Sequence, residues 1–170
     1  MDSPTLEQIL AQRSTAGRDI INVDEPVSKL VVFALNDAWF AFPGEAIREI
    51  LFQPQVFFVP GCPASFEGVI NVRGDIESVI KLEALLGQPP AESRPSSSVL
   101  LASGAGIRTG IRVDKVIDVV DLVQSAFQAP PATLSEAMQR IVRNLVVFKE
   151  HTVAVLDIEQ LLDSLAEKAS

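Results

Sequence analysis

The chain has 170 residues, of which 48% are hydrophobic, and its formal net charge is −8 at pH 7. This size is sufficient for one ordinary domain or for two small ones that share a core. The negative charge excludes nucleic acid as an expected partner and disfavours an anionic membrane surface. No apolar run approaches the roughly 18 residues of a membrane span, and the start MDSPTLEQ lacks the features of a signal peptide. These features predict a cytoplasmic protein without direct membrane insertion.

Residues 1–28 differ from the rest and are interpreted as an N-terminal extension that is helical or flexible. A loose capping pattern at 5–8 (TLEQ) precedes Ile9 and Leu10, which predicts a short amphipathic helix at most. From Lys29 onward the chain has short apolar runs separated by turn residues. The segments LVVFAL, Asn36-Asp37 and AWFAF together predict a β-hairpin.

A polar break at 88–98 (QPPAESRPSSS) divides the rest of the chain, and similar signals follow it. Residues 47–50 (IREI) align with residues 116–119 (VIDV) at a shift of 69, and residues 79–86 (VIKLEALL) align with residues 155–162 (VLDIEQLL) at a shift of 76. This internal repeat predicts two related units, 29–87 and 99–165, each of which forms a small β-barrel. Closure of each barrel would remove exposed strand edges.

Few helices are expected. Residues 82–86 form a single turn that Gly87 stops, and residues 157–169 have the spacing of one amphipathic helix. The segment TLSE at 133–136 has a capping-box pattern, which predicts a short helix that runs toward Arg140.

Few side chains are suited to catalysis. The chain has one histidine, one cysteine and no tyrosine. His151 lies in a predicted hairpin turn and Cys62 in a Gly-Cys-Pro turn, and neither has a neighbouring base or metal ligand in the sequence. The glycine-rich segment at 104–110 lacks the Lys-Ser/Thr pair of a phosphate-binding loop. We therefore expect no catalytic residue, no metal site and no cofactor, and the chain is not expected to be an enzyme.

Residues 66–74 read FEGVINVRG, which resembles the phrase that marks CheW-like domains, the coupling modules of bacterial chemotaxis. The segment AWFAFPGEAIREIL, the Val59-Pro60 step and the final VLDIEQLL are also similar to this family, so the resemblance spans about residues 29–165. It implies a mainly β fold of two packed, five-stranded SH3-like β-barrel subdomains with a short C-terminal helix. It also implies a non-catalytic adaptor that couples the cytoplasmic helical tip of a chemoreceptor to the regulatory domain of a CheA-type histidine kinase.

In this family the arginine that matches Arg73 lies near the receptor-facing groove and is linked to the acid that matches Glu49. The resemblance assigns six residues to that groove: Ile47, Glu49, Gly68, Asn71, Arg73 and Gly74. The period-two alternation of a strand places Ile70 and Val72 on one face and Asn71 and Arg73 on the other. With the two apolar residues inward, Asn71 and Arg73 are expected to point outward together.

The sequence departs from the family pattern at Ser78, Lys81 and Arg143. These departures leave a second function open, namely a kinase-binding scaffold or regulator of an accessory chemosensory pathway, for motility, pili or another output, that binds no receptor. A third function is a small-molecule-binding β-barrel that uses its apolar interior or the 104–110 loop. As an adaptor, the protein is expected to be recruited to membrane-associated receptor arrays.

Overall fold

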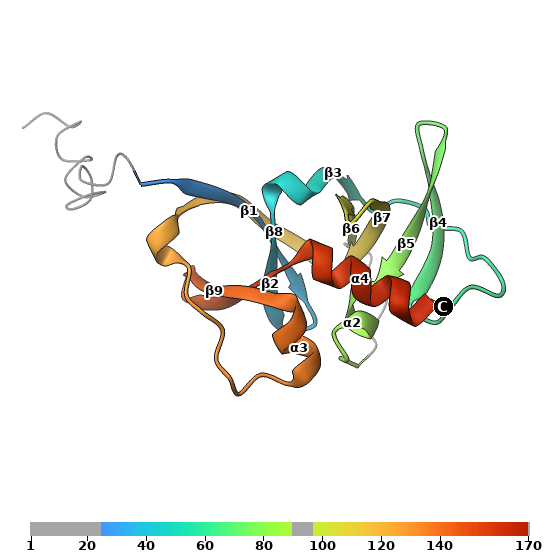
Figure 1. The fold of residues 1–170 in the computed structure, drawn as a ribbon. Helices are drawn as coiled ribbons and strands as arrows, with labels where there is room; N and C mark the ends of the chain where they lie inside the picture. Colours follow the sequence, from blue (N-terminus) through green and yellow to red (C-terminus); the bar gives the residue numbers. More distant parts are fainter. Residues whose placement is uncertain (1–24, 90–96, 170) are drawn as a thin grey trace, which may run out of the picture.

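The computed structural model describes residues 25–89 and 97–169, which fold into two five-stranded sheets with a few short helices (Figure 1). The strands are β1 (Val27–Leu35), β2 (Ala38–Pro43), β3 (Ile47–Phe52), β4 (Phe66–Val72), β5 (Asp75–Lys81), β6 (Ser98–Gly104), β7 (Ile107–Val113), β8 (Lys115–Val123), β9 (Val142–Phe148) and β10 (His151–Leu156). The helices are α2 (Leu82–Leu85), α3 (Glu136–Ile141) and α4 (Ile158–Ala169), with 3₁₀ turns at Gly44–Ala46 and Gln124–Ala126. The predicted N-terminal helix lies outside the described residues. The expected mainly β class with two five-stranded units is confirmed.

Each sheet combines strands from both halves of the chain. Sheet A has the order β8-β1-β2-β10-β9, and sheet B has the order β3-β6-β7-β5-β4. The expectation that residues 29–87 form one unit and residues 99–165 the other is therefore wrong in its assignment of strands. Sheet A takes only the β1–β2 hairpin from the first half, and sheet B takes only the β6–β7 hairpin from the second. The parallel pairs β2–β10 and β5–β7 make this exchange, because they join segments that are distant in the sequence.

The predicted repeat is visible in the structure, because corresponding residues of the two repeats pair in the same register in sheets A and B. Ala41 pairs with Val155 in sheet A, and Gly110 pairs with Val79 in sheet B. A shift of 69 residues relates Ala41 to Gly110, and a shift of 76 relates Val79 to Val155. The two sheets are thus copies of one strand arrangement in which the last three strands of each repeat have changed places.

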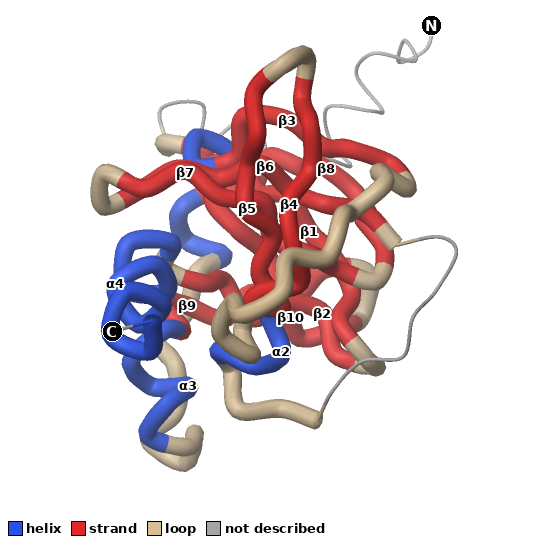
Figure 2. Tube along the Cα trace, turned by 90° about the vertical axis from the view of Figure 1, so that its right-hand side faces the viewer, coloured by secondary structure: helices blue, strands red, loops and turns tan. Residues whose placement is uncertain are grey.

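The apolar core has three parts, one inside each curled sheet and one between the sheets. Alternate residues of β1 serve two of them: Leu30 and Val32 face the interior of sheet A, whereas Val31 and Phe33 face the central part. The interior of sheet B contains Ile70, Val72, Val79, Val99 and Leu101. Both sheet interiors are therefore filled by side chains. The central part also packs against the helices, which Figure 2 shows gathered on one side of the sheets.

The predicted short helices are present. The N-cap of α3 is Ser135, whose Oγ accepts a hydrogen bond from Met138 N at 3.2 Å. The predicted capping box from Thr133 to Glu136 is therefore wrong, because the helix begins at Glu136 and its third residue is a methionine. The α2 turn ends before Gly87, and α4 places its apolar face in the central core. The buried residues of that face are Ile158, Leu161, Leu162 and Leu165.

Within residues 25–89 and 97–169, neither sheet closes into a complete barrel by direct pairing of its edge strands. In sheet B the connection after β3 forms one isolated bridge to β4, between Phe57 and Val69, and in sheet A the connection after β8 forms one to β9, between Gln128 and Leu145. Phe57 and Val69 exchange backbone hydrogen bonds of 2.8 and 2.9 Å. Among the described residues, the expected closure is thus limited to one bridge in each sheet, and a connecting segment makes this bridge in place of the opposite edge strand.

Candidate docking groove

The tip of the β4–β5 hairpin carries a cation in an unusual backbone conformation. Val72 pairs with Asp75, so Arg73 and Gly74 form a two-residue loop with φ values of +51° and +93°. These values fit a type I′ turn, whose second position suits glycine because glycine has no Cβ. Asn71 Oδ1 accepts a hydrogen bond from Gly74 N at 2.8 Å and stabilises the turn.

The expected strand position of Arg73 is wrong, because β4 ends at Val72 and the turn conformation takes over. The alternation holds within the strand itself: Ile70 and Val72 are buried, and Asn71 between them is exposed. The direction of the Arg73 side chain is therefore set by the turn and not by the pleat of a strand.

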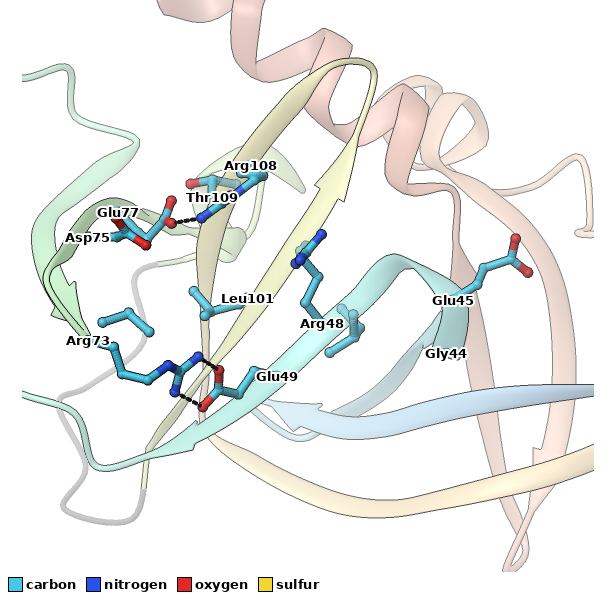
Figure 3. Close-up of a pocket in the computed structure, with 13 residues that line it drawn as sticks. Gly44, Glu45, Arg48, Glu49, Arg73, Asp75, Glu77, Leu101, Arg108 and Thr109 are labelled. Carbon is cyan, nitrogen blue, oxygen red and sulfur yellow. Dashed lines mark hydrogen bonds and ion pairs between the residues drawn. The ribbon is translucent and has the colours of Figure 1, made fainter.

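Arg73 and Glu49 form a bidentate ion pair across sheet B (Figure 3). Arg73 Nη1 donates to Glu49 Oε2 at 3.0 Å, and Nη2 donates to Oε1 at 2.5 Å. Glu49 lies on β3 and Arg73 follows β4, and these strands are the two edges of the sheet. The pair therefore connects opposite edges, and its fork geometry fixes the orientation of both side chains. The hydrogen bonds from Arg73 lower the pKa of Glu49, and the same bonds raise the pKa of Arg73.

A groove of about 570 Å³ lies beside this pair (Figure 3). Its apolar lining is formed by Ile47, Val72, Leu101 and Ala102, and its charged lining by Glu45, Arg48, Glu49, Arg73, Asp75, Glu77 and Arg108. Three of the six predicted residues, Ile47, Glu49 and Arg73, thus line one groove. Asn71 lines an adjoining groove of about 490 Å³, which Arg73 shares.

Gly68 and Gly74 have roles in the backbone. A Cβ on Gly68 would lie 2.1 Å from the carbonyl oxygen of Phe57, and the φ of Gly68 is +156°. Gly68 therefore allows the connection after β3 to approach β4 and form its bridge. Gly74 completes the turn that presents Arg73. These backbone roles need no partner.

Sequence reasoning missed a second ion pair in the groove. Arg108 on β7 donates to Glu77 on β5, whose side chain is only 10% exposed. The parallel pairing of β5 with β7 brings these two strands together. This contact could not be predicted from a sequence pattern, because Glu77 and Arg108 are distant in the chain and become neighbours only when β5 pairs with β7.

Sequence reasoning also missed three exposed aromatic residues, Phe52, Phe57 and Phe58, which are here called the phenylalanine patch. These three residues are 72%, 51% and 75% exposed to solvent, respectively. Phe52 and Phe57 line the adjoining groove together with Arg73. The segment FQPQVFFVP was a usable signal, since Pro54 ends the strand and leaves the aromatic residues on a connection at the surface.

The repeat supplies a second acid–cation pair in sheet A. Asp118 on the edge strand β8 and Lys149 in the β9–β10 turn are 3.9 Å apart, and Lys149 has a φ of +50°. The shifts of 69 and 76 relate Asp118 to Glu49 and Lys149 to Arg73. The sheet A pair is a single, longer contact, so it provides an internal reference for the closer pair in sheet B.

The described residues contain no group of three or more His, Cys, Asp or Glu side chains that could hold a metal ion.

The sequence pattern predicts His151 in a hairpin turn, but that turn is formed by Lys149 and Glu150. His151 is the first residue of β10, and its ring stacks on the ring of Trp39 with centroids 3.7 Å apart. Within 25–89 and 97–169, no helix is long and apolar enough to cross a membrane.

Two of the departures from the family pattern have partners inside the fold. The hydroxyl of Ser78 on β5 lies 2.8 Å from that of Thr109 on β7, within hydrogen-bond distance. Arg143 Nη2 lies 3.5 Å from a carboxylate oxygen of Asp157, next to the start of α4. Lys81 precedes α2 and makes no side-chain cap. Ser78 and Arg143 thus take part in contacts between neighbouring elements.

The fold and the groove define a class of protein: a two-sheet β module with a charged external groove next to an apolar patch. The CheW-like domain family matches residues 29–166. The chain belongs to the CheW-like domain family.

Several relatives of this chain are named chemotaxis proteins. It is 25% identical over 142 residues to the probable chemotaxis protein CheW of Rhizobium etli, covering 84% of this chain and 92% of that protein. It is 23% identical to the chemotaxis protein CheW of Bacillus subtilis, with coverage of 84% and 91%. It is 25% identical over 129 residues to the protein PilI of Pseudomonas aeruginosa, with 72% of each chain covered. The crystal structure of the scaffolding protein TtCheW from Thermoanaerobacter tengcongensis has the same fold, with a TM-score of 0.71 at 22% identity over 80% of this chain and 92% of that chain.

Proposed function

We propose that this protein is a non-catalytic adaptor that joins the helical tip of a chemoreceptor to the regulatory domain of a CheA-type histidine kinase. It acts in the cytoplasm at membrane-associated receptor arrays of a chemotaxis or chemotaxis-like pathway. The observation that carries this proposal is the Glu49–Arg73 pair, which holds two charged side chains in fixed positions on the rim of a groove. The family membership and the chemotaxis names of the relatives support it.

The groove suits an amphipathic helical segment. Ile47 is partly exposed on its lining, whereas Val72, Leu101 and Ala102 are buried, so the apolar contact that a helix could make there is small. Seven charged side chains also line it, and they would make most of the contacts with the polar face of a helix. Because Arg73 and Glu49 already satisfy each other, they orient the rim without requiring a partner charge.

The phenylalanine patch suits the kinase. Exposed aromatic residues that are close together mark a surface that another protein covers, and Phe52 and Phe57 line one groove. Phe57 and Phe52 share a groove with Arg73, so the patch adjoins the receptor groove without being part of it. Two neighbouring surfaces would let one small module hold both partners at once.

The test is co-purification of this protein with the regulatory domain of each CheA-type kinase of its source organism, with and without a receptor signalling-tip fragment. Arg73→Glu should release the receptor fragment, because reversal of the charge breaks the pair and changes the rim. Lys149→Glu is the matched control, since it reverses a cation at the corresponding turn position of sheet A. Phe58→Ser should weaken the kinase complex and spare receptor binding.

The outcomes separate the candidate functions. Loss of the receptor fragment with Arg73→Glu, but not with Lys149→Glu, supports an adaptor with its groove on sheet B. Kinase binding without any receptor binding would instead establish a scaffold. Failure to bind any kinase domain would contradict both functions.

A further inference from the structure

Arg48 has a place in the groove that differs from that of the other two cations. The groove is lined by three arginines, of which Arg73 pairs with Glu49 and Arg108 pairs with Glu77. Within the described part of the chain, the guanidinium of Arg48 has no carboxylate or hydrogen-bond partner. Figure 3 shows both other arginines on dashed lines to carboxylates and Arg48 on none, while the nearby Glu45 points away from it. Arg48 is thus an exposed cation at the groove whose pairing capacity is unused.

The backbone presents Arg48 at a β-bulge. Ile47 pairs with Ala102 and Glu49 pairs with Leu101, so Arg48 is the extra residue between two successive pairs of the β3–β6 ladder. Bulges of this kind re-aim a side chain away from the regular alternation of a strand. Arg48 lines the main groove and also a smaller one of about 290 Å³ toward Val119 of sheet A.

The repeat shows what the fold itself requires at this position. A shift of 69 residues relates Arg48 to Ile117, which is the extra residue at the matching bulge between β8 and β1. Ile117 packs against the apolar interior of sheet A. The same bulge therefore accepts an apolar side chain that packs inward, and packing does not explain an arginine in the sheet B copy.

We infer that Arg48 is the specificity-determining residue of the groove and that it binds a carboxylate of the helical segment that enters. This inference rests on the function proposed above. A chain with a net charge of −8 repels acidic partners at long range. An acidic side chain on the segment is therefore accepted only where a cation is available, and Arg48 offers up to two hydrogen bonds in a planar fork. The position of that acid along the helix would select one receptor segment over another.

The experiment titrates the receptor signalling-tip fragment onto full-length wild-type protein and onto three variants. Arg48→Ile installs the residue of the other repeat, so it should fold normally and weaken binding by about tenfold or more, the loss expected for a hydrogen bond to a charged group. Arg48→Lys should retain most of the affinity, and Arg48→Glu should lose the most. Binding of the kinase regulatory domain should stay unchanged in all three.

A charge exchange identifies the partner residue. Each acidic residue of the receptor fragment is replaced in turn by lysine, and one replacement should restore binding to the Arg48→Glu variant. If wild-type protein binds the fragment and Arg48→Ile binds it equally well, this inference is wrong and the proposed function stands. If wild-type protein binds no receptor fragment, the proposed function and this inference fail together.

Discussion

At the residue scale, Arg73 shows how a backbone conformation directs a charge. Its left-handed φ is uncommon for a residue with a Cβ. The conformation turns the side chain out of the β4 alternation and toward the opposite edge of the sheet, where it meets Glu49. Lys149 has nearly the same φ in the corresponding turn of sheet A, so both copies of the repeat share this turn geometry. The close bidentate ion pair is formed in sheet B, whereas the sheet A pair is a single, longer contact.

We expect the affinity of the groove for the receptor fragment to be constant between about pH 6 and about pH 8. Arg73 lowers the pKa of Glu49, so this carboxyl stays ionised throughout that interval. A lowered pKa means that the pair is complete above the ordinary carboxyl range and is lost only as the pH falls through the lowered value. Titrations of the fragment at a series of pH values measure this dependence.

Glu49→Gln is the matched variant for this prediction, because it removes the charge and keeps the shape of the side chain. At neutral pH it should weaken receptor binding and leave the fold intact. A wild-type affinity that decreased steadily from pH 8 to pH 6 would show that another titrating group controls the groove.

At the element scale, the β4–β5 hairpin separates a packing face from a partner face. Ile70 is 1% exposed inside sheet B, whereas Ile76, on the paired strand, is 63% exposed. Both are isoleucines on one hairpin, so their difference comes from the pleat and the curl of the sheet.

Ile70→Asp should destabilise the protein by about 3 to 5 kcal/mol or more, because it leaves an unpaired carboxylate in an apolar interior. Ile76→Asp is the control and should change the free energy of unfolding by less than about 1 kcal/mol. Urea unfolding followed by circular dichroism compares the two variants. Equal stability of the two variants would contradict the inward position of Ile70.

At the scale of the whole molecule, the exchange of strands makes the two halves of the chain dependent on each other. Sheet A needs β8, β9 and β10 from the second half, and sheet B needs β3, β4 and β5 from the first. The central core also draws on both halves, for example through Phe33 and Leu161. Neither half contains a complete sheet, so neither can bury its apolar residues alone.

Fragments 25–89 and 97–169, expressed separately, should each be unfolded and should form a folded one-to-one complex when mixed. Circular dichroism and size-exclusion chromatography measure the two states. Cooperative unfolding of either fragment by itself would contradict the exchange of strands and restore the simpler arrangement of one unit per half.

Much of the local structure could be predicted from the sequence. The hairpins, the short helix α3 and the apolar face of α4 each depend on residues within a few positions of one another, so their patterns are visible in the chain. The family phrase at 66–74 also pointed to Glu49 and Arg73 as a linked pair. The sequence pattern misplaces Arg73, because the alternation of the strand ends at Val72 and Arg73 already belongs to the turn.

The sequence by itself determined the β class, the repeat and the short helices, because alternation, turn residues and caps act over short distances. Only the tertiary structure decided which strands share a sheet, where the groove lies and which of its arginines lacks an acid. Those features depend on parallel pairs between distant strands and on the curl that brings β3 and β4 together, and both are fixed by burial of the whole core. The argument for Arg48 needs both the sequence and the tertiary structure. The sequence repeat identifies Ile117 as its counterpart, and the β-bulge in the folded sheet places Arg48 at the groove.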